Sequence, residues 1–205
     1  MRRLAAAGRL RRLKKGAFVV VDPVRETPSI AIASGLYLET THYVTTDAAL
    51  AFHGLLDQPV PIITVVLARR ARPLGIGDAT VRAVALASRW LKGADAYETT
   101  VEGFAVRVAG REQAVVDALA EPAWMIHGSL LPEILAAFSD VELARTADRA
   151  LARSTAAAQR LGYLQEETGR ALPPALASLR PVRAVRLRPG RASPGPYSSR
   201  WRVYG

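Results

Sequence analysis

Residues 1–23 read MRRLAAAGRLRRLKKGAFVVVDP, and this stretch decides how the rest of the chain is interpreted. Seven of its first fifteen residues are Arg or Lys, and none of its first twenty-one is acidic. The pattern predicts a short helix over 2–7, a turn at Gly8 and two paired strands, RLRRL and AFVVV. We expect the strands to turn at Lys15-Gly16, because glycine adopts a positive φ without steric cost.

A helix followed by a tight basic ribbon is the back half of a winged helix. In that design the helix enters the major groove of DNA and the ribbon reaches the flanking phosphates. Seven cations are therefore predicted to bind nucleic acid: Arg2, Arg3, Arg9, Arg11, Arg12, Lys14 and Lys15. Five apolar residues would form the floor of this small module: Leu4, Leu10, Leu13, Phe18 and Val20. The alternative is an ordinary hairpin whose edge is protected by charge.

The net charge of +10 is concentrated at the two ends of the chain. Residues 16–169 contain thirteen basic and eighteen acidic residues, whereas the chain from Arg170 onward contains eight arginines and no acid. Such basic clusters are the electrostatic footprint of a protein that binds a polyanion, and nucleic acid is the first candidate. The alternative is a solvated face with a disordered basic tail.

The basic C-terminal segment also has the pattern of paired strands. VRAVRLRP and SSRWRVYG alternate, with Trp201 and Val203 expected on a buried face. The exposed face would then form a second basic surface, made of Arg183, Arg186, Arg188, Arg200 and Arg202.

Between its two ends the chain predicts strands first and helices afterwards. Helices are expected over 111–120, about 131–138, from Ser139 with a capping box, and over 155–167. We expect an α+β fold with two domains: a partial N-terminal winged-helix remnant, a helix plus a β-ribbon, at 1–24, and a mixed α/β domain at 25–205.

No motif predicts catalysis. The chain has no cysteine, and its three histidines do not have metal-ligand spacing. The HGS stretch at 127–129 lacks the glycine-flanked serine of a nucleophile elbow. We therefore predict no catalytic residue, no metal and no cofactor, and we expect a protein that is not an enzyme. No apolar run is long enough to cross a bilayer, so a cytoplasmic protein without a membrane partner is expected.

The order of motifs resembles the AbiEi-type antitoxins of type IV toxin–antitoxin systems. LAAAGRLRRLKKGAFVV is similar to the family's winged-helix end, with Phe18 in place of the usual tyrosine. YVTTDAALAFHGLLDQ and VAGREQAVVDALAEP resemble the next two blocks, with Gln113 in place of lysine. RLGYLQE and VRLRPG…SSRWRVYG resemble the closing blocks, so the resemblance spans nearly the whole chain.

The resemblance implies a two-part protein. Its winged helix would bind the promoter DNA of its own operon and repress it, and its C-terminal antitoxin domain would neutralise a cognate nucleotidyltransferase-like toxin. A complete winged helix needs two earlier helices, for which this chain has no room, so we expect an upstream start or a degenerate module. The alternative function is a protein-interaction module that opposes the toxin directly without specific DNA binding. A third interpretation is an enzyme that acts on the toxin's product.

Overall fold

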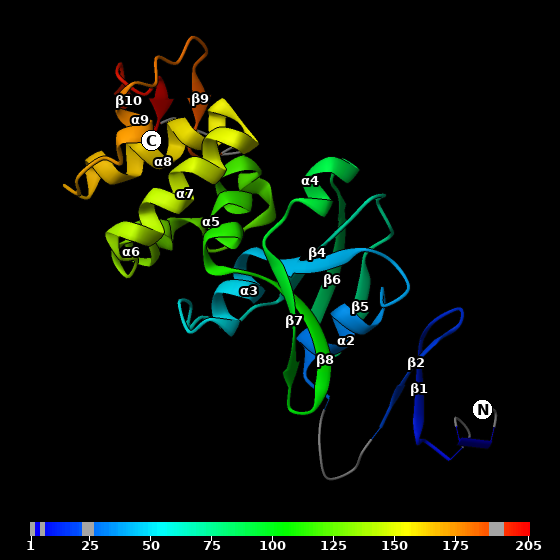
Figure 1. Ribbon diagram of the computed structural model, residues 1–205. Helices are drawn as coiled ribbons and strands as arrows, with labels where there is room; N and C mark the ends of the chain where they lie inside the picture. Colours follow the sequence, from blue (N-terminus) through cyan, green and yellow to red (C-terminus); the bar gives the residue numbers. More distant parts are fainter. Residues whose placement is uncertain (1–2, 5–6, 22–26, 189–194) are drawn as a thin grey trace. The chain divides into compact units, whose positions relative to one another are not determined.

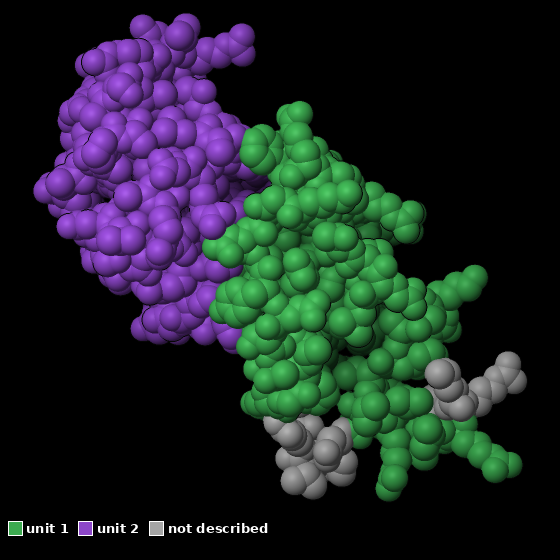
Figure 2. Space-filling model, viewed as in Figure 1, with its two compact units in different colours: residues 1–48, 59–109 green, residues 49–58, 110–205 purple. Residues whose placement is uncertain are grey.

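The computed structural model describes residues 3–4, 7–21, 27–188 and 195–205. The chain forms two compact units (Figure 2). Unit 1 contains residues 1–48 and 59–109, and unit 2 contains residues 49–58 and 110–205. The predicted domain boundary at 24/25 lies outside the described residues.

Unit 1 is built on strands, most of which are labelled in Figure 1. Its helices and strands are β1 (Leu10–Lys14), β2 (Ala17–Val20), α2 (Ser29–Gly35), β3 (His42–Thr45), β4 (Ile62–Leu67), β5 (Leu74–Ile76), β6 (Ala79–Ala85), α4 (Ser88–Lys92), β7 (Ala96–Val101) and β8 (Phe104–Ala109). Helix α3 (Thr46–Phe52) begins in this unit and ends in unit 2.

Six of these strands form one mixed sheet in the order β5-β6-β4-β3-β8-β7. Strands β4 and β6 are parallel, as are β3 and β8, whereas the other neighbours are antiparallel. The β-branched run of β4 is almost wholly buried, as expected for a central strand with apolar residues on both faces. Helix α2 packs Ile32 and Ala33 on the sheet core.

Unit 2 is mainly helical. It contains α5 (Arg111–Ala120), η1 (Pro122–Trp124), η2 (Gly128–Leu130), α6 (Leu131–Ala136), α7 (Asp140–Arg153), α8 (Thr155–Glu167), α9 (Pro174–Ala177), β9 (Val185–Arg186), β10 (Tyr197–Ser198) and β11 (Val203–Tyr204). Helices α5, α7 and α8 pack on one another, and the three short strands form a sheet in the order β10-β11-β9.

The start of α7 shows how directly a local motif can determine structure. The Ser139 backbone N–H donates to Glu142 Oε2 at 2.8 Å, and the Glu142 backbone N–H donates to Ser139 Oγ at 3.3 Å. These bonds satisfy two backbone donors that a helix start leaves open. The hydrogen bonds from Ser139 also lower the pKa of Glu142, because they favour the charged carboxylate.

Most of the predicted elements are confirmed, and the fold is mixed α+β. The turn at Gly16 has a φ of 80°, and β1 pairs with β2 as expected. Helices α5 and α8 have the predicted bounds. Helix α4 and strands β5 and β10 were not predicted. Trp201 is 1% exposed, but it lies in the turn before β11 rather than in the strand.

Candidate nucleic-acid interface

The β1–β2 hairpin places most of the predicted nucleic-acid-binding residues on its exposed surface. Leu10 pairs with Val20, and Arg12 pairs with Phe18, before a bulge between Arg12 and Lys14 shifts the register. The described cations of this region are all exposed: Arg3, Arg9, Arg11, Arg12, Lys14 and Lys15. Arg2 lies outside the described residues. The hairpin region therefore presents positive charge to solvent, with Arg11 beside Val19 on one face and Arg12 beside Phe18 on the other.

Lys14 is the exception, because it holds the hairpin to the rest of unit 1. Its Nζ donates to the Leu36 carbonyl at 3.2 Å and lies 4.5 Å from the centre of the Tyr37 ring. Leu13 and Val19 pack against the core of the sheet beside this contact. Lys14 is thus an anchor of the hairpin within unit 1.

The expected apolar floor of the hairpin is wrong in part. Leu4 is 47% exposed, Phe18 36% and Val20 65%, whereas Leu13 is half-buried on the sheet core. The reason is that the strands do not close over a small core of their own. Instead, they use one side to cover the edge of the larger sheet core and leave the other side to solvent.

The hairpin cations also lack acidic partners. Among the described residues, no carboxylate lies within 4.0 Å of the side chains of Arg3, Arg9, Arg11, Arg12 or Lys15. Arg12 instead makes one long bond, 3.4 Å from its Nε to the Lys14 carbonyl. By sequence, unit 1 has fifteen basic and eight acidic residues, a net charge of +7. Its charge is therefore available to a polyanion.

The second predicted basic surface lies in unit 2 and is used differently. Arg183, Arg186, Arg200 and Arg202 are exposed, and Arg188 is half-buried. Arg200 forms an ion pair with Glu166 at 3.0 Å, and Arg202 Nη1 donates to the Val182 carbonyl at 2.7 Å. Two of the five arginines thus satisfy acceptors of the protein itself, which weakens this surface as a phosphate site.

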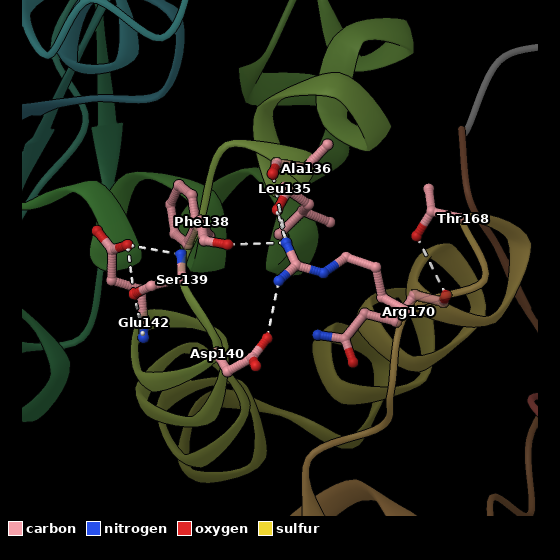
Figure 3. Close-up of polar contacts among 9 residues, drawn as sticks. Leu135, Ala136, Phe138, Ser139, Asp140, Glu142, Thr168 and Arg170 are labelled. Atoms are coloured by element: carbon pink, nitrogen blue, oxygen red, sulfur yellow. Dashed lines mark hydrogen bonds and ion pairs between the residues drawn. The ribbon is translucent and has the colours of Figure 1, made fainter.

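Arg170, the first arginine of the basic C-terminal segment, is a structural residue. Figure 3 shows its guanidinium between the end of α6 and the start of α7. Arg170 Nη1 donates to the carbonyls of Leu135 at 3.0 Å and Phe138 at 2.7 Å, and Nη2 contacts Asp140 Oδ1 at 2.9 Å. A helix leaves its last carbonyls without partners, and a cation is favoured there by the helix dipole.

Arg160 does the same for α5, although nothing in the sequence singled it out. Its Nη1 donates to the Leu119 carbonyl at 2.6 Å, and its Nε donates to the Arg186 carbonyl at 2.8 Å. Burial lowers the pKa of Arg160, because the charged form loses hydration, while Glu121 acts in the opposite direction. This side chain joins the end of α5 to β9.

Trp201 completes the packing of the C-terminal segment. A Cβ placed on Gly162 of α8 would lie 2.3 Å from the Trp201 ring, so only glycine fits beneath the indole. The indole N–H donates to Glu166 Oε2, and Gln159 Nε2 donates to the Trp201 carbonyl at 2.8 Å. The segment is held by this network, as the alternating pattern predicted.

The structure adds one basic loop that the sequence analysis missed. Arg69, Arg70 and Arg72 follow β4 and are exposed. Arg69 and Lys92 line a groove of about 1000 Å³, together with the β1–β2 hairpin. The net charge of residues 16–169 does not indicate this loop, because the acidic residues of the later helices make that net charge negative. The run ARRAR was the local signal that would have found it.

One histidine has a defined polar environment, although no catalytic role was predicted for it. His42 is 3% exposed, and its Nε2 lies 2.9 Å from Ser34 Oγ. Ser34 Oγ also accepts the Arg107 backbone N–H at 3.0 Å. The Thr40 carbonyl lies 2.9 Å from His42 Nδ1 and can only accept, so Nδ1 carries the hydrogen and donates it. In the neutral ring Nε2 is then the acceptor, and Ser34 Oγ donates to it. The network fixes the neutral tautomer, and burial lowers the pKa of His42.

The described residues contain no group of three or more His, Cys, Asp or Glu side chains placed to hold a metal ion. Their helices also include none with the length and apolar character needed to span a bilayer.

Comparisons with known proteins give a fold relationship. No protein-family model and no curated protein matches the chain. The chain is similar to the crystal structure of the RV2827C protein from Mycobacterium tuberculosis, with a TM-score of 0.66 and 18% sequence identity. The match covers 98% of this chain and 77% of that chain. At this identity the similarity shows the fold alone, the mixed α+β arrangement described above.

Proposed function

We propose that this protein is an antitoxin of the AbiEi type that represses its own operon and neutralises a nucleotidyltransferase-like toxin. The β1–β2 hairpin acts as the wing of a partial winged helix, and its cations contact the phosphates of promoter DNA. One observation carries the DNA-binding half: five described cations of the hairpin region project to solvent without a carboxylate partner among the described residues.

The anchor at Lys14 supports the same function. A wing must hold its cations in a fixed position relative to the body that docks on DNA, since phosphate contacts set register and orientation. Leu13 and Val19 fix one side of the hairpin on the sheet core, and the Lys14 bond to Leu36 fixes its turn end. Arg11 and Arg12 are therefore presented from a supported strand rather than from a loose arm.

The DNA-binding half is tested by a mobility-shift titration of the protein with duplex DNA from upstream of its own gene. If about four cations meet phosphates, log K falls against log salt with a slope of about −3.6. The double variant Arg11→Ala/Arg12→Ala should reduce the steepness of that slope by about 2. The matched control is Arg183→Ala/Arg186→Ala, which removes two exposed arginines from unit 2. Absence of binding at low salt would refute the proposal.

The antitoxin half is tested separately by co-expression with the toxin encoded alongside. A variant with Arg9, Arg11, Arg12 and Lys15 replaced by glutamine leaves Leu13, Lys14 and Val19 in place, so unit 1 keeps its packing. We expect this variant to lose repression of a promoter reporter and to retain rescue of growth. Loss of both activities in a folded variant would contradict the division of roles between the hairpin and the rest of the chain.

A further inference from the structure

A groove in unit 1 runs beside the anchored hairpin. Residues of β1 and β2 form one wall, and α2 with the following loop, the loop after β4, and α4 form the rest. Its volume of about 1000 Å³ is at the upper end of the usual range for small-molecule pockets. Figure 2 draws this unit in green. The groove therefore has room for a segment of a chain-like ligand as well as for a small molecule.

The charge lining the groove is predominantly positive. Lys15, Arg69 and Lys92 line it in addition to the anchor Lys14, and Glu39 is the carboxylate among the described lining residues. Arg70 and Arg72 extend the positive charge along the loop after β4. The lining cations come from three separate parts of unit 1, the hairpin turn, the loop after β4 and α4, and their charge favours a polyanion.

The groove also contains exposed aromatic rings. Phe18 is 36% exposed and Phe104 is 38% exposed, and Tyr37 is the third ring of the lining. Phe18 comes from the hairpin and Phe104 from the start of β8, so the two rings are supplied by different elements of unit 1. Single exposed apolar side chains need no explanation, but aromatic rings among cations are the stacking surfaces that single-stranded nucleic-acid sites use.

We propose that this groove binds a single strand of nucleic acid, with phosphates at Lys15, Arg69 and Lys92 and bases stacked on Phe18 and Phe104. A duplex keeps its bases stacked on one another and presents no base face to a side wall. An acidic peptide would meet the cations but would gain nothing specific from the rings. The combination of charge and aromatic rings therefore favours an unpaired strand.

This site goes beyond the proposed repressor function and does not depend on it. Duplex binding is assigned to the exposed cations of the hairpin, whereas strand binding is assigned to the groove, and Lys15 alone belongs to both. A fluorescein-labelled ten-nucleotide single strand, as RNA and as DNA, reports on the groove in an anisotropy titration of the full chain. The ten-base-pair duplex of the same sequence reports on the hairpin, so failure of one proposal is distinguishable from failure of the other.

The decisive variants are Phe18→Leu and Phe104→Leu, which remove the ring and keep an apolar side chain. Each should weaken strand binding by about fivefold or more and change duplex binding by less than twofold. The charge variant Arg69→Glu/Lys92→Glu should weaken strand binding by about tenfold at low salt. Arg183→Glu/Arg186→Glu in unit 2 is the matched charge control and should leave strand binding unchanged. Thermal unfolding of each variant verifies that the fold is intact.

Two outcomes overturn the proposal. In the first, both leucine variants bind the single strand with the affinity of the unaltered protein while remaining folded. In the second, a ten-residue polyglutamate peptide displaces the strand as effectively as an unlabelled strand does, which would identify the groove as a general anion site. The proposal is supported if the protein binds the single strand, the leucine variants bind it more weakly, and the polyglutamate peptide does not displace it.

Discussion

The β1–β2 hairpin region and the segment from Arg170 to Arg202 are both rich in arginine, and the protein uses them in opposite ways. In the hairpin, Arg11 and Arg12 project to solvent and the core contacts are made by apolar neighbours. In the C-terminal segment, Arg170 and Arg202 donate to backbone carbonyls of unit 2. Similar composition thus yields solvent-exposed charge in one region and internal support in the other.

The difference follows from what surrounds each region. Unit 2 contains many short helices, and each helix end exposes carbonyl groups that need donors. Arginine supplies up to five donors in a fixed fork, so one side chain can satisfy several carbonyls at once. In the hairpin, backbone N–H and C=O groups bond to each other across the strand pair, so arginine side chains are not required as donors to them. Arginines near helix ends should therefore be assigned to capping before they are counted as a charged surface.

The largest expected effect tests whether the C-terminal segment is packed. Trp201→Ala should lower the free energy of unfolding by about 3–5 kcal/mol, because it removes a large buried ring and leaves a cavity on α8. The measurement is urea unfolding followed by circular dichroism. Tyr197→Ala is the control, since Tyr197 is 46% exposed and should cost far less. Equal stability of the two variants would show that the segment is loose.

A second substitution at the same contact sharpens this result. Gly162→Ala should cost about 1–3 kcal/mol, because the added methyl group overlaps the Trp201 ring. In the Trp201→Ala background the same change should cost little, since the overlapping ring is gone. Additive costs in this double-mutant cycle would place the ring elsewhere.

Apart from the changes at the Trp201 contact, Arg160→Met should lower the free energy of unfolding most, by about 3 kcal/mol. The substitution leaves the carbonyls of Leu119 and Arg186 without their donor in a buried site. Arg160→Lys keeps a positive charge and one donor group, so it should recover part of the loss. If methionine stabilises the protein instead, the hydrogen bonds do not outweigh the cost of burying the guanidinium.

The pH dependence of the free energy of unfolding tests the environment of His42 in unit 1. Burial lowers the folded-state pKa of His42, so between its folded and unfolded values the unfolded chain binds more protons. The His42 contribution is therefore complete above about pH 6.5, the unfolded value, and is lost as pH falls toward the folded value. His42→Gln should reduce this loss in unfolding titrations between pH 7 and pH 5. An identical pH profile in the variant would exclude His42 as the source.

The smallest effect on the free energy of unfolding is expected for the hairpin arginines, in contrast to the arginines of the C-terminal segment. Arg11→Ala and Arg12→Ala should each change the free energy of unfolding by no more than about 0.5 kcal/mol, since both side chains are exposed. Lys14→Ala should cost more than either, because it removes the bond to Leu36. Thermal unfolding of the three variants distinguishes the anchor from the open cations. A large loss of stability in Arg11→Ala would show that Arg11 has a structural role.

Local signals predicted much of the fold. The capping box at Ser139 and the turn at Gly16 act over three or four residues, so the sequence contains the whole interaction. The use of Arg160 and Arg170 was not predictable, because their carbonyl partners are 26 to 41 residues away along the chain. The burial of Trp201 was predicted from alternation, although its place in a turn was not. The aromatic groove depends on the tertiary packing of separate elements and has no local pattern.

The division of the chain has a consequence for its synthesis on the ribosome. The polypeptide passes between the two units after Ala48, after Gln58 and after Ala109. Strand β3 needs β8 as its neighbour, so the sheet cannot close before residue 109 has been made. The stretch 49–58, which contains the fully buried Leu50, waits longer still for residues beyond 110. The apolar side chains of 49–58 are therefore synthesised early and buried late. Because the chain crosses between the units three times, cleavage at one peptide bond cannot separate two intact units.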